Sequence, residues 1–145
     1  ISGDIKGLFN FGEDPVRTDP NTHHVIKSLE SLDFFAIDEL FMTETAKLAD
    51  VILPGRSYAE KEGTFSNTER RVQRVRKAVE IEGDTKPDTW IFTEIMRRMG
   101  YPQPHLTPAQ IMDEIASVTP SFAGISHERL DSEEVNGQGL QWPCT

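Results

Sequence analysis

Acidic side chains gather at two turns in the first third of the chain. The first turn is Gly12-Glu13-Asp14-Pro15, and the second is the pair Asp38-Glu39. Carboxylates repel phosphate but accept hydrogen bonds well, so they suit ribose hydroxyls or the donor edge of guanine, where a ring N–H and an amino group match a carboxylate fork. Backbone N–H groups at a helix start could still take a phosphate. The competing interpretation is that Asp and Glu simply form turns and cap helices.

The apolar runs around these turns predict the elements that position them. Strands are expected at residues 5–11, 34–37 and 51–53, because each is a short apolar run. Between them we expect one helix with Asp19 as its N-cap and Pro20 at its first position, and a short helix over residues 43–48. This alternation predicts an α/β fold, a Rossmann-like, doubly wound and mostly parallel sheet with flanking helices. Ligands of such sheets lie outside the carboxyl ends of the strands, so both acidic turns are expected to face one crevice.

The second half of the chain is predicted to be more helical. One helix follows Pro87 and ends before Gly100, and a second begins at the capping box Thr107-Pro108-Ala109-Gln110. Residues 63–77 form an extended excursion, for which a hairpin and a helix both remain open. We therefore expect one α/β domain over residues 1–118 and an irregular tail or linker over residues 119–145.

Composition excludes several classes of function. The chain has 145 residues and a net charge of −9, which argues against general attraction to nucleic acid. The basic cluster between Arg70 and Lys77 has no aromatic residues suited to base stacking, so we do not expect it to bind nucleic acid, and the residues alone favour a solvated stripe. No apolar run is long enough to span a membrane. The single Cys144 and four scattered histidines make no metal-ligand spacing, and a reducing compartment is favoured, with the cytoplasm expected and the periplasm as the alternative.

A longer stretch narrows the function. Residues 41–80, together with Gly12-Glu13-Asp14-Pro15 and the terminal Gln141-Trp142-Pro143-Cys144, resemble the molybdopterin oxidoreductase family and, within it, the alpha (catalytic) subunits of formate dehydrogenases. The resemblance implies one of two related α/β domains that together hold a molybdenum or tungsten cofactor with two pyranopterin guanine dinucleotides, each domain binding one guanosine end. The acidic turns would then serve a guanosine site.

The resemblance also implies a longer parent enzyme. An iron-sulfur cluster and the metal-ligating and catalytic residues would lie on the N-terminal side, with the remaining domains of the same chain and electron-transfer subunits as partners. The parent would oxidise formate to carbon dioxide. This fragment has no catalytic or metal-ligating residue of its own and is expected to be inactive alone.

Carried over position by position, the family pattern gives a set of cofactor-binding candidates. Gly12 allows close backbone approach, Asp14 and Asp88 contact guanosine, and Lys61 lies near the cofactor phosphates. Read from the residues alone, Lys61 is instead a solvated surface charge and Asp88 a helix start. The whole candidate set is Gly12, Glu13, Asp14, Thr18, Asp38, Glu39, Lys61 and Asp88.

Three alternatives stay open at this point. Another family member such as a nitrate reductase shares this domain. The large subunit of a respiratory NADH dehydrogenase keeps the same fold as structure without the cofactor. An independent interaction module would use the acidic surface as its binding face.

Overall fold

The computed structural model describes residues 3–80 and 83–145, which form two compact units. Among the described residues, unit 1 comprises 3–56 and 83–94, and unit 2 comprises 57–80 and 95–145. The division differs from the boundary at residue 118 that we expected from the sequence. It differs because the chain leaves unit 1 after its third strand, returns to it, and then completes unit 2.

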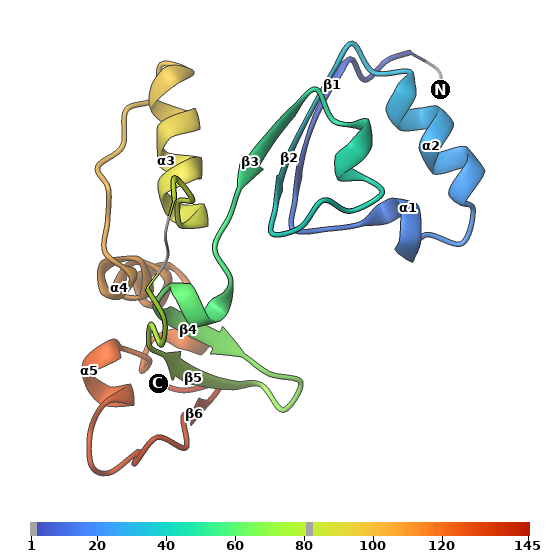
Figure 1. The fold of residues 1–145 in the computed structure, drawn as a ribbon. Helices are drawn as coiled ribbons and strands as arrows, with labels where there is room; N and C mark the ends of the chain where they lie inside the picture. Colours follow the sequence, from blue (N-terminus) through green and yellow to red (C-terminus); the bar gives the residue numbers. More distant parts are fainter. Residues whose placement is uncertain (1–2, 81–82) are drawn as a thin grey trace. The chain divides into compact units, whose positions relative to one another are not determined.

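Unit 1 is built on a three-stranded parallel sheet in the order β1-β2-β3. The strands are β1 (Gly7–Phe11), β2 (Phe34–Glu39) and β3 (Val51–Pro54). The helices α1 (Pro15–Thr18) and α2 (Thr22–Glu30) connect the first two strands, and the short helix η1 (Ala46–Leu48) precedes the third. Figure 1 shows α1 and α2 on one side of the sheet. The α/β class and the three predicted strands are confirmed.

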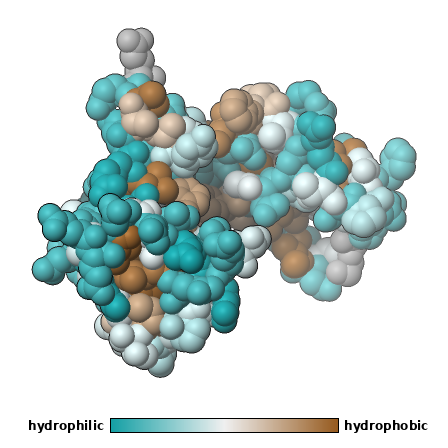
Figure 2. All heavy atoms as spheres, turned by 90° about the horizontal axis from the view of Figure 1, so that it is seen from below, coloured by the Kyte–Doolittle hydropathy of each residue, from teal (hydrophilic) through white to brown (hydrophobic). Residues whose placement is uncertain are grey.

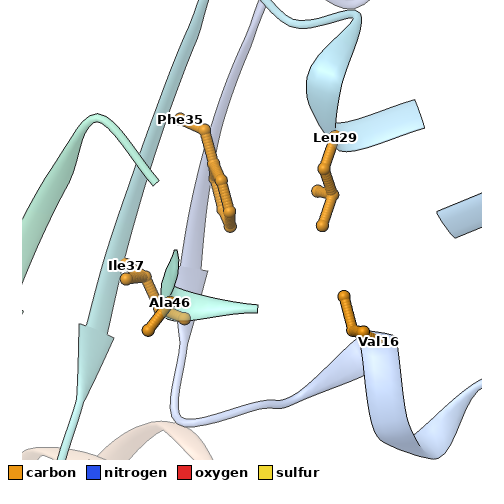
Figure 3. Close-up of a cluster of buried hydrophobic side chains, with 5 residues drawn as sticks. All are labelled: Val16, Leu29, Phe35, Ile37 and Ala46. Carbon is orange, nitrogen blue, oxygen red and sulfur yellow. The ribbon is translucent and has the colours of Figure 1, made fainter. Parts of the chain in front are cut away.

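A buried cluster holds these helices to one face of the sheet. Phe35 and Ile37 are 2% and 0% exposed, and they share a face because strand side chains alternate. They pack with Val16 of α1, Leu29 of α2 and Ala46 of η1 (Figure 3). Burying a side chain such as Phe35, Ile37 or Leu29 contributes about 1.5–3 kcal/mol. The cluster therefore holds α1 and η1 against this face of the sheet.

The other face of the sheet is covered by the start of α3 (Asp88–Arg98). The ring of Phe92 meets those of Phe9 and Phe11, with centroid separations of 5.8 and 4.9 Å. Phe9 pairs with Ala36 and Phe11 with Asp38, which puts Asp38 on this face and opposite to the Phe35 and Ile37 side chains. Helices therefore contact both faces of the sheet, although Phe11 and Phe92 remain partly exposed.

The predicted start of the first long helix is wrong. Asp19 has extended backbone and ends α1, because the residue before a proline avoids the helical region. Asn21 is the N-cap of α2 instead, and its side chain accepts a hydrogen bond from the His24 N–H at 3.1 Å. The result is a one-turn helix directly after the acidic loop, which the sequence patterns did not predict.

Unit 2 contains a second, antiparallel sheet in the order β4-β5-β6. Its strands are β4 (Gly63–Ser66), β5 (Arg71–Val75) and β6 (Leu140–Gln141), so residues 63–77 form a hairpin rather than a helix. The remaining elements are η2 (Tyr58–Glu60), α4 (Pro108–Val118), η3 (Pro120–Phe122) and α5 (His127–Leu130). The capping box predicted at Thr107 and Gln110 is confirmed at the start of α4.

The irregular tail expected over residues 119–145 is instead an integral part of unit 2. Ile125 and Leu130 are 1% and 3% exposed and pack with Val72 and Met112. Leu140 pairs with Val72 in the antiparallel sheet. Isolated apolar anchors and a two-residue strand produce no sequence period, which is why the pattern did not reveal them.

The surface carries apolar side chains at separate places among hydrophilic ones, as the face in Figure 2 shows. Phe41, Met99 and Val118 are 76%, 81% and 73% exposed. No helix in the described ranges is long and apolar enough to cross a membrane. Within residues 3–80 and 83–145, no group of three or more His, Cys, Asp and Glu side chains is arranged to hold a metal ion.

Candidate functional site

Backbone hydrogen bonds tie the carboxyl ends of the three parallel strands together. The Gly12 N–H, in the loop after β1, donates to the Asp38 carbonyl at 2.9 Å. The Gly55 N–H, after β3, donates to the Glu39 carbonyl at 3.3 Å. The side chain of Asn10 donates to the Glu13 carbonyl at 2.7 Å and closes the first loop. The acidic turns therefore do meet at one edge of the sheet.

Two carboxylates converge on Gly55 at this edge. A Cβ atom on Gly55 would lie 2.5 Å from Asp38 Oδ1 and 3.4 Å from Asp88 Oδ1. Asp38 is 2% exposed near the end of β2, whereas Asp88 is half-buried in the first turn of α3. Real Cβ atoms are not found 2.5 Å from another heavy atom, so glycine is required here by its neighbours rather than by its backbone angles.

Contacts between β3 and the segment before α3 hold Asp88 in this position. The Lys86 N–H donates to the Pro54 carbonyl at 3.3 Å. Arg56 Nη2 donates to the Thr85 carbonyl at 2.9 Å. The end of β3 is thus fastened to the chain just before Asp88, and the two carboxylates are fixed by different elements.

Adjacent carboxylate oxygens have a definite chemical preference. They accept hydrogen bonds and cannot donate them, so they suit a ligand edge with neighbouring N–H or O–H donors. The edge is therefore suited to a donor-rich group such as a guanine edge or a ribose diol.

Gly12 leaves the backbone open beside this pair. Its φ of +61° is a conformation that glycine adopts at little cost, and no heavy atom lies within 4 Å of the position a Cβ would take. A ligand can therefore approach the backbone directly at this point. The close approach of a nucleotide to Gly12 stays a prediction.

Asp14 makes its hydrogen bonds to the protein. Its Oδ1 accepts from the Thr45 hydroxyl at 2.6 Å and from the Thr45 N–H at 3.3 Å. Thr45 is fully buried, and its Oγ1 also accepts from the Val16 N–H at 3.1 Å. The Thr18 hydroxyl donates to the Asp14 carbonyl at 3.2 Å.

The other predicted residues lie at the rim or elsewhere. Glu13 is exposed, and Glu39 is half-buried with its Oε1 accepting from the Leu40 N–H at 2.7 Å. Thr18 is exposed on α1. Lys61 follows η2 and belongs to unit 2, whereas all the other candidates belong to unit 1.

Sequence reasoning missed three residues that shape the site. Gly55 and Arg56 directly follow the third predicted strand, so the rule that placed the acidic turns at the sheet edge could have found them. Thr45 gave no such signal, because a threonine in a short helical segment is unremarkable in sequence. Its importance comes from its burial between Asp14 and Val16.

Comparison with known proteins gives a consistent result. The family model described as molybdopterin oxidoreductase matches residues 1–98. The chain is 49% identical over 142 residues to the alpha subunit of F420-dependent formate dehydrogenase 2 of Methanococcus maripaludis, covering 97% of the chain and 20% of that protein. It is 46% identical over 142 residues to a putative formate dehydrogenase of Staphylococcus haemolyticus, covering 98% of the chain and 14% of that protein.

A solved structure is also similar. Acetylene hydratase from Pelobacter acetylenicus superimposes with a TM-score of 0.68 at 25% identity, covering 86% of this chain and 17% of that one. The chain thus spans a fifth or less of the length of the proteins it matches here.

Proposed function

Because the chain belongs to the molybdopterin oxidoreductase family, we propose that unit 1 holds one guanosine arm of a bis-pyranopterin guanine dinucleotide cofactor of molybdenum or tungsten. The observation that carries this proposal is the convergence of the Asp38 and Asp88 carboxylates on Gly55. It lies at the carboxyl edge of a parallel sheet, where ligands of such folds bind.

The donor and acceptor pattern fits a guanosine. Guanine offers a ring N–H next to an amino group, and ribose offers two adjacent hydroxyls, so both present the paired donors that Asp38 and Asp88 accept. The open backbone at Gly12 leaves room for either the base or the ribose of the nucleoside to lie close to the chain. Asp88 is half-buried and is the more accessible carboxylate, whereas Asp38 is 2% exposed.

The parent polypeptide, by this proposal, oxidises formate to carbon dioxide. The support is that relatives aligned over nearly the whole of this chain are named as formate dehydrogenases. When bound, the cofactor supplies the metal that receives two electrons from the substrate. Unit 1 contributes rigidity, since Asp38 is held by a strand and Asp88 by a helix start, and rigid elements preserve the geometry of a site.

The remaining parts of the proposal concern the parent. Electrons leave through an iron-sulfur cluster in another part of the polypeptide and pass to electron-transfer subunits, in the cytoplasm. Lys61 of unit 2 serves the cofactor phosphates. The chain described here contributes no catalytic residue.

The test is to express the full-length parent in a host that makes the cofactor and to measure molybdenum, tungsten and iron per polypeptide. Guanosine monophosphate released by acid is measured on the same samples. We expect molybdenum or tungsten together with guanosine nucleotide, and a marked loss of both in Asp88→Ala. Glu30→Ala, at the exposed end of α2, is the matched control and should retain them. Iron without either metal and without guanosine would refute the proposal and favour a cofactor-free structural subunit.

A further inference from the structure

The carboxylate of Asp14 is bonded to a buried residue of the protein. Its Oδ1 accepts two hydrogen bonds from one residue, at 2.6 Å from the Thr45 hydroxyl and 3.3 Å from the Thr45 N–H. The hydroxyl of Thr45 has a single proton and uses it in the hydrogen bond that it donates to Asp14. Its oxygen then accepts from the Val16 N–H at 3.1 Å, so Val16, Thr45 and Asp14 form one directed chain of hydrogen bonds.

This chain of bonds runs from the buried Thr45 to the half-buried Asp14. Thr45 is 0% exposed, and its neighbours Ala46 and Val16 belong to the cluster between the sheet and α1 (Figure 3). The Val16 N–H is in the first turn of α1, where backbone donors have no partner within the helix. Thr45 therefore provides a hydrogen-bond partner both for the Val16 N–H and for the Asp14 carboxylate. A buried polar group that is left without a hydrogen bond lowers the stability of the fold.

The geometry also separates Asp14 from the Asp38 and Asp88 pair. The cluster with Val16 and Ala46 lies on the face of the sheet that carries Phe35 and Ile37. Asp38 lies on the opposite face, in register with Phe11 and near the start of α3. The carboxylate of Asp14 is thus bonded on the α1 side of the sheet edge, while the convergent pair is on the α3 side.

We propose that Asp14 is a positioning residue whose carboxylate, held by the buried hydroxyl of Thr45, fixes the Gly12–Asp14 loop against which the guanosine arm lies. This rests on the proposed function of unit 1. Thr45, which neither the acidic motif nor the resemblance singled out, is the residue that sets the loop. Asp14 acts through Thr45 rather than by reading the nucleoside.

The proposal is tested in the full-length parent loaded with cofactor. The variants separate the ability of residue 14 to accept a hydrogen bond from its negative charge. Asp14→Asn keeps an oxygen that accepts from Thr45, whereas Asp14→Ala removes it. Thr45→Ser keeps the hydroxyl, whereas Thr45→Val removes it at nearly the same volume. Thr22→Val, at the exposed start of α2, is the matched control. The readout is the half-life of bound guanosine nucleotide after transfer to cofactor-free buffer.

We expect Asp14→Ala and Thr45→Val each to shorten this half-life by about tenfold, the effect of losing one hydrogen bond to a charged group. The double variant should lose no more than either single one, because both remove the same bond. Thr45→Ser and Asp14→Asn should recover most of the half-life. A Thr45→Val variant that retains nucleotide like the control, or losses that add in the double variant, would overturn the proposal and make Asp14 a direct ligand.

A second readout does not depend on the cofactor. Hydrogen exchange of the Val16 N–H, which donates to Thr45, should become at least about tenfold faster in Thr45→Val and in Asp14→Ala while the control is unchanged. If the parent proves to hold no guanosine, the proposed function fails while this exchange measurement still decides whether Thr45 fixes the loop. Unchanged exchange in Thr45→Val would refute the positioning role itself.

Discussion

Replacing Gly55 by alanine tests the arrangement of the two carboxylates directly. The new methyl group would lie 2.5 Å from Asp38 Oδ1, and Asp38 is 2% exposed near the end of a central strand, so relieving the contact requires the shift of a buried side chain. Overpacking of this kind costs about 1–3 kcal/mol. Gly55 does not have a left-handed backbone, so the substitution brings no torsional strain of its own. Apart from the unfolded-state effect that any Gly→Ala change carries, the result therefore reports the contacts with Asp38 and Asp88.

The assay is native-state hydrogen exchange of the β2 amides in the full-length protein, which gives a local free energy of opening. Gly7→Ala is the control, since its Cβ would meet only the Phe34 carbonyl at 3.8 Å, an ordinary contact. Alanine there should be neutral or stabilising by up to about 1 kcal/mol through the unfolded state. If Gly55→Ala lowers the opening free energy no more than Gly7→Ala does, Asp38 and Gly55 are not packed as described.

Three further predictions concern unit 2. Burial, and after it the nearby charge of Arg74, lowers the pKa of His127 below its ordinary value of 6.5, so the folded state resists protonation. The contribution of His127 to stability is therefore full above pH 6.5 and falls as the pH drops below that value. The His127→Gln variant should flatten this part of a profile of melting temperature against pH. Asp131→Ala removes the partner of Arg74 and Arg76 and should cost only about 1 kcal/mol in chemical denaturation, because Asp131 is 37% exposed, with Arg76→Ala costing less. Thr107→Ala removes the N-cap of α4 and should lower the protection of its first amides by about 1 kcal/mol in hydrogen exchange.

The sequence was a good guide wherever one local rule decided the outcome. The apolar runs at 34–37 and 51–53 are strands, as short uninterrupted runs of this kind predict for a parallel sheet, although Val51 and Ile52 of the second run are exposed. The capping box at Thr107 begins a helix, since both of its reciprocal hydrogen bonds form within four residues. The acidic turns meet at one edge because parallel strands end together.

Contacts between distant residues were beyond such rules. Thr45 meets Asp14 across 31 positions, and neither residue has a local pattern that indicates the other. Ile125 and Leu130 enter the core of unit 2 from a stretch without a period, so their burial depends on Val72 and Met112 rather than on neighbours in the chain. Asp19 failed as an N-cap because the constraint from Pro20 outweighed its capping preference.

The placement of the two carboxylates explains how such an edge would discriminate between nucleosides. Asp38 is almost fully buried, and an acceptor in that position loses about 1–3 kcal/mol when a bound group fails to donate to it. A base without paired donors, such as adenine, would bring a ring acceptor to the position where guanine brings a ring N–H. By the proposed function, selectivity would come from the cost of the wrong partner, which requires that the carboxylates stay in place. Their attachment to a strand and a helix start, with Gly55 between them, provides that rigidity.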